Sequence, residues 1–278
     1  MKIGIVTDST CDLPRSIISA LNITVIPVYI NLDGHSFLDQ IELSRKDFYE
    51  RLPKCKLPAT TSAPGIGTFI KVYKRLAGEG VDHILSVHIH EGLSNIINVA
   101  RLAAEATKSI SVDVIDSGNL TIGTGLVARA AASAARAGNS INEVIEHAQR
   151  TVKSAYAYAV LDTLEYLKIG GRLSNLKYNL GTMLDIKPIM KMHDGDVDMD
   201  MVRTWRKGKQ KIFELLSELG TISQLAIVHA NAQQKAEQLF TDATSIIDPT
   251  KILMGGDVSP AIGVHVGPGA LCFVGIKE

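Results

Sequence analysis

Neither charge is in excess in this sequence. Its 29 Lys and Arg residues balance 29 Asp and Glu residues, which leaves a net charge of +0 at pH 7. Nucleic acids and anionic membranes attract a basic excess, so this balance argues against nucleic acid as a partner and allows at most transient membrane contact. No apolar run reaches the length of a membrane span, and Asp8 interrupts the first apolar stretch before a signal-length run develops. We therefore expect a cytoplasmic protein.

Cysteine and aromatic residues are scarce as well. Cys11, Cys55 and Cys272 are an odd number at wide spacing, which fits neither a disulfide framework nor a structural zinc site. Aromatic residues make up 5% of the chain and hydrophobic residues 46%, so aliphatic side chains must fill the interior. Such a core suits a smooth apolar tunnel and equally an ordinary α/β fold. Neither a Walker-type phosphate loop nor a nucleophile elbow is present, so we do not expect a nucleotide enzyme.

Two groups of potential metal ligands are weak candidates. His88 and His90, with His83 upstream, would place two imidazoles on one strand face, but no carboxylate or cysteine partner has an evident spacing. The aspartates at every second position of 194–200 lack the glutamate that closes an EF-hand loop, and their spacing is typical of a solvated strand face. We expect no metal and no cofactor of the protein's own.

Short β-branched runs alternate with helical patterns, which predicts an α/β fold. The length favours two domains. We place a parallel-sheet domain at residues 1–160 and a smaller α/β domain at 161–278, with a hinge near Gly170-Gly171 and a hairpin around Asp194-Gly195. The expected strands are 2–6, 23–30, 83–89, 112–115, 156–161, 188–192, 197–203 and 225–229, with others at 252 and 270–276. The expected helices are 14–21, 44–52, 65–77, 93–107, 123–137, 140–154, 208–219 and 233–241.

The stretch 258–271 places one histidine, His265, in what the pattern predicts to be a loop of small residues. Gly267 and Gly269 flank Pro268 and allow a backbone to approach a ligand closely, and His265 adds a titratable donor. We expect a ligand-binding site here.

This stretch resembles the closing signature of the DegV family, and further blocks match that family in order. Together these blocks span nearly the whole chain, so the sequence is identified as a member of the DegV family. The blocks are Ile5 to Pro14, Thr61-Ser62-Ala63-Pro64, Gly92-Leu93-Ser94, Leu164 to Arg172, and Ile186-Lys187-Pro188-Ile189.

The resemblance implies a fold and a function. The fold is a two-domain DegV-like α/β fold with the ligand between the domains. The function is to bind a single long-chain fatty acid and to present its carboxylate to a separate, dihydroxyacetone-kinase-like fatty acid kinase. That partner would supply ATP and Mg, and the product would be a bound acyl phosphate for phospholipid synthesis. No catalytic residue of the chain's own is implied.

The resemblance also implies roles for individual residues. Thr61, Ser94 and His265 would bind the carboxylate, with Ser62 completing that loop. Ser and Thr at helix starts are otherwise caps, and a residue can do both. Asp8 and Ser9, after the first strand, would support the site as turn residues, as would Gly267 and Gly269.

Two arginines match basic positions of the family. Arg172 and Arg203 would contact the partner or its phosphoryl group, and the alternative is an ordinary helix-end charge or surface ion pair. The sequence departs from the family pattern at Trp205, where a basic residue is common, which leaves the polarity of this contact surface open. It also departs at Ala63, at 95–97 and at Cys272, which leaves the chain length of the ligand open.

Two other functions stay open at this point. A stand-alone hydrolase or transferase acting on a small carboxylate or phosphate ligand would use Asp8 and His265 as an acid/base pair. A lipid carrier or sensor would bind the same fatty acid without ever meeting a kinase.

Overall fold

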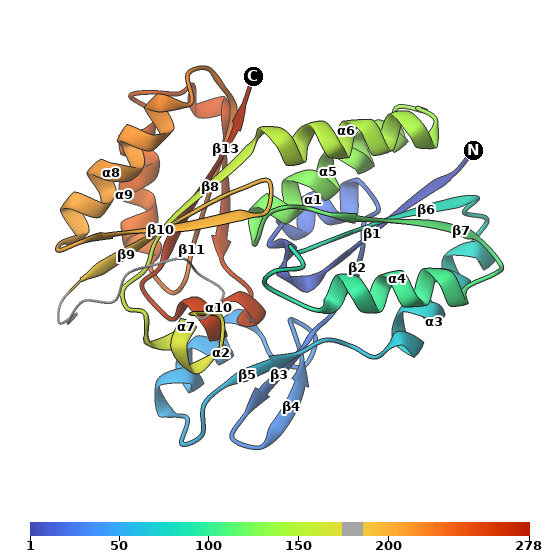
Figure 1. Cartoon of the computed structure of the whole chain (residues 1–278), viewed down its shortest axis with the longest axis horizontal. Helices are drawn as coiled ribbons and strands as arrows, with labels where there is room; N and C mark the ends of the chain where they lie inside the picture. Colours follow the sequence, from blue (N-terminus) through green and yellow to red (C-terminus); the bar gives the residue numbers. More distant parts are fainter. Residues whose placement is uncertain (174–185) are drawn as a thin grey trace.

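A four-stranded parallel sheet organises the first part of the chain (Figure 1). The computed structural model describes residues 1–173 and 186–278. The strand order is β2-β1-β6-β7, and every neighbouring pair is parallel. Helices α3 and α4 lie on one side of this sheet, and α5 and α6 lie on the other (Figure 1). The elements are β1 (Ile3–Asp8), β2 (Thr24–Ile26), β6 (His83–His88), β7 (Ser111–Asp116), α1 (Arg15–Ala20), α3 (Ile66–Gly78), α4 (Ile96–Ala106), α5 (Ile122–Arg136) and α6 (Ile141–Ser154).

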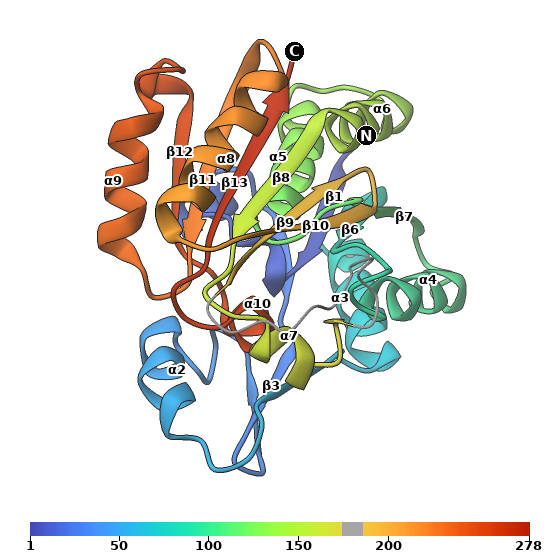
Figure 2. The same cartoon turned by 60° about the vertical axis from the view of Figure 1, so that its left-hand side comes forward.

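A six-stranded sheet forms the second part, in the order β10-β9-β8-β13-β11-β12. Neighbours are antiparallel except β11 and β12, which are parallel. Helices α8 and α9 cover its outer face, and α5 and α6 lie between the two sheets (Figure 2). The elements are β8 (Ala155–Val160), β9 (Lys187–His193), β10 (Asp196–Val202), β11 (Ile222–His229), β12 (Ile252–Asp257), β13 (Leu271–Lys277), α8 (Trp205–Glu218) and α9 (Gln233–Ala243). The expected α/β class, with a parallel-sheet domain and a further sheet domain, is confirmed.

Side chains alternate across the second sheet with the period of a strand. Along β13, Leu271 and Phe273 join the core under α8 and α9, whereas Cys272 and Val274 join the core between the sheets. Both faces of β13 are therefore buried, which is why this strand reads as a continuous apolar run.

Strand β8 belongs to the second sheet, because it pairs with both β13 and β9. The expected boundary between residues 160 and 161 stays a prediction, and sheet membership alone would divide the chain before Ala155. The β9–β10 hairpin turns at Asp194-Gly195, as expected.

A third sheet, with three antiparallel strands, was not predicted from the sequence. Its order is β4-β3-β5, with β3 (Tyr29–Leu32), β4 (His35–Leu38) and β5 (Thr60–Ser62), and α2 (Arg45–Arg51) connects β4 to β5. The single strand expected at 23–30 is wrong, since the chain leaves the parallel sheet after Ile26. Pro27 has no N–H to donate, so the ladder ends there and Tyr29 begins a strand of another sheet.

The stretch around His265 is a helix, not the loop expected from its small residues. Helix α10 (Pro260–Val266) follows Ser259 at the N-cap position and has Pro260 in its first turn, an arrangement typical of helix starts. It ends at Gly267, whose φ of +69° favours glycine, and a Cβ there would overlap the ring of Tyr166. His265 consequently sits on a fixed last turn.

Within residues 1–173 and 186–278, no helix combines the length and the apolar character that crossing a bilayer requires.

Candidate ligand-binding site

A cavity of about 320 Å³ lies where the loops of the parallel sheet meet α10 and β9. Its volume falls at the lower end of the range for small-molecule sites. Apolar side chains dominate its wall, and the polar ones come from five separate segments of the chain. The lining residues are Thr10, Val28, Thr61, Ser62, Ala63, Ile89, Leu93, Ser94, Asn95, Leu120, Leu167, Arg172, Met190, Ala261, Ile262, His265 and Val266.

Thr61 and His265 meet at the wall of this cavity. Thr61 Oγ1 lies 2.9 Å from His265 Nε2. The other ring nitrogen, Nδ1, is buried without a hydrogen-bond partner in the described part of the chain. Gly170 packs against it so closely that a Cβ at this position would overlap Nδ1. The third sheet and α10 thus bring together two residues that the sequence placed in the site separately.

His265 is neutral at neutral pH. Burial, and then the nearby charge of Arg172, lowers the pKa of His265 to about 4. One nitrogen of the neutral ring carries the proton, and an unpartnered buried N–H is rarer than an unpartnered buried acceptor. Hydrogen-bond balance therefore assigns the proton to Nε2. His265 then donates to Thr61 Oγ1, which frees the threonine hydroxyl to donate into the cavity.

Arg172 joins two loops at the cavity. Its Nε donates to the carbonyl of Leu93 at 3.3 Å, and its Nη1 donates to the carbonyl of Gly170 at 2.7 Å. Half-burial lowers the pKa of Arg172 from its ordinary value, but a guanidinium keeps its proton. Among the described lining residues, Arg172 alone carries a full charge.

Arg203 lies elsewhere. It follows the end of β10, is exposed and does not line the cavity. The structure therefore does not bring together the two arginines that the sequence analysis paired.

Ser94 and Ser62 both line the cavity. Ser94 Oγ accepts the backbone N–H of Ile96 at 3.3 Å just before α4, and its hydroxyl hydrogen is left for another acceptor. It is thus a helix-start residue and a cavity residue together. Ser62 is an exposed residue of β5, one position from Thr61.

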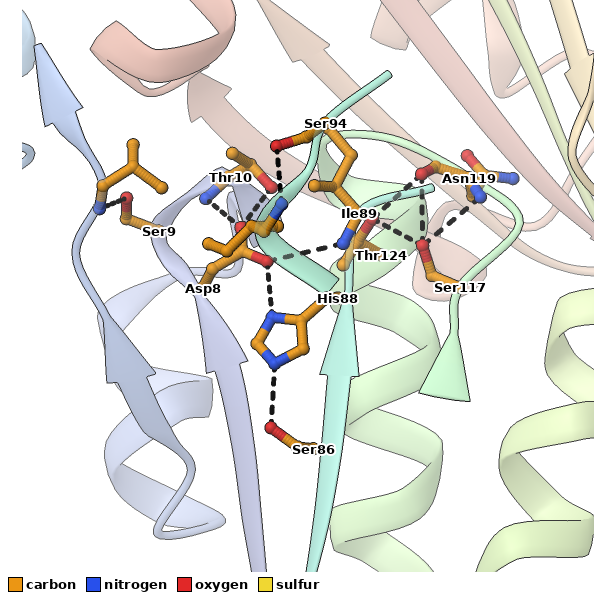
Figure 3. Close-up of polar contacts among 12 residues, drawn as sticks. Asp8, Ser9, Thr10, Ser86, His88, Ile89, Ser94, Ser117, Asn119 and Thr124 are labelled. Atoms are coloured by element: carbon orange, nitrogen blue, oxygen red, sulfur yellow. Dashed lines mark hydrogen bonds and ion pairs between the residues drawn. The ribbon is translucent and has the colours of Figure 1, made fainter. Parts of the chain in front are cut away.

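Asp8 anchors a buried chain of hydrogen bonds behind the cavity (Figure 3). Asp8 Oδ2 lies 2.8 Å from His88 Nδ1, and His88 Nε2 lies 2.8 Å from Ser86 Oγ, which accepts from Tyr73. Burial alone would raise the pKa of Asp8, but the hydrogen bond and charge of His88 and the two donors of Thr10 outweigh it, so the pKa lies below its ordinary value. Asp8 is a fixed anion.

The order Asp8, His88, Ser86 resembles a hydrolase triad, but these side chains are fully buried and line neither the main cavity nor the smaller one behind it. What the chain of bonds does is to hold Thr10, whose N–H and hydroxyl both donate to Asp8. Because the Thr10 hydroxyl already donates its hydrogen to Asp8, it can only accept a hydrogen bond from a ligand. Sequence reasoning missed this network, although Ser86 and His88 stand two apart on one strand face.

Ser9 and Asp12 tie the first loop to distant segments. Ser9 Oγ accepts the N–H of Val28 at 3.1 Å. Asp12 accepts from Thr121 Oγ1 and from the N–H of Ser259, both at 2.6 Å, and pairs with Arg45 at 3.1 Å. Burial raises the pKa of Asp12 to about 6 despite these partners. These contacts fix the first loop, α5 and α10 relative to one another.

The structure does not form the acid/base pair of Asp8 and His265. Both oxygens of Asp8 are engaged by His88, Thr10 and the N–H of Ile89, and the described ring contact of His265 is with Thr61.

The candidate metal ligands pair off with other groups. His83, His88 and His90 each contact a different aspartate: Asp113, Asp8 and Asp116. Of the aspartates at 194–200, Asp198 and Asp200 flank Lys191 at 2.8 and 3.1 Å. In the described residues, no three metal-binding side chains gather at one point.

Known proteins resemble this chain in sequence and in fold. The model of the DegV family, described as a family of uncharacterised proteins, matches residues 2–278. Protein DegV of Bacillus subtilis is 31% identical over 282 residues, which cover 98% of this chain and 100% of that protein. The chain belongs to the DegV family.

Two solved structures of DegV family members are similar to this chain over its whole length. A DegV family protein from Thermus thermophilus, described by its fatty acid binding, has a TM-score of 0.89 at 27% identity, with 100% of both chains covered. DegV of Bacillus subtilis, described as a fatty acid binding protein, has a TM-score of 0.90 at 29% identity, also with 100% of both chains covered. The DegV fold is therefore shown.

The departures from the DegV family pattern fall in different places. Ala63 and Asn95 line the main cavity, and Cys272 lines a smaller hollow behind it. Trp205 starts α8 on the outer face of the second sheet, where Lys235 Nζ lies 5.1 Å from its ring centroid. Only the first three bear on the shape of the ligand space.

Proposed function

We propose that this chain binds one long-chain fatty acid, holds the tail between the parallel sheet and the six-stranded sheet, and presents the carboxylate to a separate ATP-dependent fatty acid kinase. One observation carries the proposal: an apolar cavity whose hydroxyl donors, Thr61 and Ser94, stand at its wall beside Arg172. The fatty acid binding of the two DegV relatives supports the choice of ligand.

The tail dominates the affinity in this proposal. Each buried methylene contributes roughly 0.8 kcal/mol, so ten contribute on the order of 8 kcal/mol, whereas one neutral hydrogen bond nets about 1 kcal/mol. The donors at the wall therefore fix the orientation of the carboxylate more than they fix the affinity.

The proposed binding of the carboxylate rests on which hydroxyl groups have a hydrogen left to donate. Thr61 and Ser94 donate hydroxyl hydrogens to the carboxylate, and His265 orients Thr61 through Nε2. Arg172 places one positive charge at the same wall, and in the described contacts its guanidinium donates to backbone carbonyls and forms no ion pair. The neutral donors Thr61 and Ser94 leave electron density on the second oxygen. When a kinase supplies ATP and Mg, this oxygen is suited to attack the terminal phosphorus of ATP, with ADP as the leaving group. The product would be a bound acyl phosphate for phospholipid synthesis, made in the cytoplasm.

Mass spectrometry of the purified protein tests the binding step. Native spectra give the stoichiometry, and denaturing extraction identifies the lipid. One fatty acid per chain supports the proposal, and an empty protein or one carrying a polar metabolite overturns it.

Ser94→Ala tests the presenting step. We expect the variant to keep its lipid, because the tail dominates binding, and to form acyl phosphate more slowly with a fatty acid kinase. Loss of lipid from a folded variant would contradict this division of roles. A wild-type protein that holds fatty acid but changes neither its lipid nor its exchange rate with kinase and ATP would be a carrier or sensor.

A further inference from the structure

A second apolar space lies directly behind the main cavity. It measures about 20 Å³, and its wall is apolar apart from Thr121 and His229. The wall between the two spaces consists of the residues that line both: Leu120, Met190, Ile262 and Val266.

The floor of this inner hollow follows from strand register. Met190 on β9 pairs with Ala159 on β8, Ala159 pairs with Cys272 on β13, and Cys272 pairs with Val228 on β11. Residues that pair in register project from the same face of a sheet. All four join the core between the sheets and line the hollow. Ala159 and Cys272, in the middle of this row, have small side chains, and the hollow lies beside them.

Met190 is the adaptable member of the dividing wall. Leu120, Ile262 and Val266 are branched, and the last two are fixed on α10. Met190 is 4% exposed and held by backbone pairing on both sides, but its unbranched side chain can change rotamer without moving the strand. A rotation of this one side chain would join the two spaces.

We propose that the methyl end of the fatty acid enters the hollow above Ala159 and Cys272 past Met190, and that this row of side chains sets the longest chain that the protein accepts. The inference rests on the proposed function, because it needs a fatty acid with its carboxylate at Thr61. Specificity for chain length then lies in the second sheet, at the opposite end of the ligand from the carboxylate site.

Variants of the row test the inference, with affinities for myristic, palmitic, stearic and arachidic acids as the readout. Ala159→Val and Cys272→Val fill the hollow with residues that strands accept, so the affinity ratio of stearic to myristic acid should fall about fourfold for each methylene excluded. Met190→Ala removes the barrier and should raise the ratio of arachidic to stearic acid. Met192→Ala is the matched control, since Met192 is buried two residues along the same face and lines neither space.

Chain-length ratios that stay at the wild-type value in the filling variants and in Met190→Ala would overturn the inference. A wild-type protein that binds none of the four acids would instead overturn the proposed function. A shift in Met192→Ala as large as that in Met190→Ala would also count against the inference, since it would show a general loosening of the core.

A measurement on the wild-type protein covers the case in which a filling variant does not fold. Palmitic acid with a photoactivatable diazirine at its methyl end is bound, irradiated and mapped by peptide mass spectrometry. Adducts on 157–160 or 270–273 support the inference. Adducts confined to residues that line only the main cavity, such as Leu167, refute it.

Discussion

Thr61 Oγ1 and His265 Nε2 lie 2.9 Å apart although 204 residues separate them in the chain. One belongs to an edge strand of the small third sheet and the other to the last turn of α10. His265 donates its Nε2 hydrogen to Thr61 Oγ1, and this contact leaves the hydroxyl hydrogen of Thr61 to point into the cavity. This polar part of the cavity wall is therefore built jointly by the first and last thirds of the sequence.

Thr61→Val should weaken fatty acid binding modestly. The variant removes one neutral donor and leaves the tail contacts intact, so we expect an affinity loss of about fivefold to tenfold. Thr61→Ser keeps the hydroxyl and should stay within twofold. Competition with a fluorescent fatty acid measures both, and equal losses in the two variants would contradict a role for the hydroxyl.

His265 should remain neutral over the physiological pH range. Its folded-state pKa of about 4 lies below the ordinary value of 6.5, so its contribution to stability is complete above about pH 6.5 and is lost as the pH falls toward 4. NMR of protein with labelled histidine should show a neutral ring protonated at Nε2 at pH 7. A ring that titrates near 6.5, or one protonated at Nδ1, would contradict the donor assignment.

Arg172 and Arg203 should separate binding from partner recognition. Arg172→Ala removes two charge-assisted hydrogen bonds that join loops at the cavity, so we expect fatty acid affinity to fall about tenfold or more. Arg203→Ala changes an exposed residue and should leave that affinity within twofold, while it raises the KM of the kinase for the loaded protein in a salt-dependent way. Titration calorimetry and acyl-phosphate assays distinguish the two, and equal effects on binding would contradict the assignment.

Gly267→Ala should destabilise the fold by more than its backbone conformation explains. Gly267 and Gly138 have φ values of +69° and +86°, but only at Gly267 does an added Cβ meet a side chain, the Tyr166 ring. Gly138→Ala should cost about 1 kcal/mol from strain alone, and Gly267→Ala on the order of 3 kcal/mol. Urea denaturation measures both. Equal losses would mean that Tyr166 moves aside freely.

Asp39→Asn should change how stability depends on pH. Asp39 is 1% exposed, and burial raises its pKa from 3.8 to about 7. Between these values the folded state binds the proton more tightly than the unfolded state, so stability falls as the pH rises through this window. The variant should match the wild type near pH 4 and exceed it by on the order of 2 kcal/mol at about pH 8. Urea melts at both pH values test this, with the exposed Glu105→Gln as control. A difference between variant and wild type that is constant with pH would exclude Asp39 as its cause.

Local signals in the sequence predicted much of the fold. The capping box of Ser140 and Glu143 starts α6, and the Asp194-Gly195 pair turns the β9–β10 hairpin as expected. The split at Pro27 was in principle readable, because proline cannot donate to a ladder. The short strands β4 and β5 were not, since strands of three or four residues gain most of their stability from partners elsewhere in the chain.

The residues of the candidate site were also predictable only in part. The family motifs led to Thr61, Ser94 and Arg172, which line one cavity. Thr10 follows the first strand and was expected to be a turn residue, yet it lines the cavity too, and no motif indicated that Arg203 lies outside it. The hydrogen bonds that hold Thr10 reach from Asp8 to His88, 80 residues away. Such pairs depend on register between strands, which the spacing of residues in the sequence does not reveal.

The position of β13 in its sheet has a consequence for biosynthesis. This strand lies between β8 and β11, yet it is made after every other strand of the sheet. Until β13 leaves the ribosome, β8 and β11 each present an unpaired edge, and the hollow beside Ala159 lacks the side that Cys272 provides. The nascent chain is therefore open to aggregation late in translation, and the hollow can close only after β13 has joined the sheet.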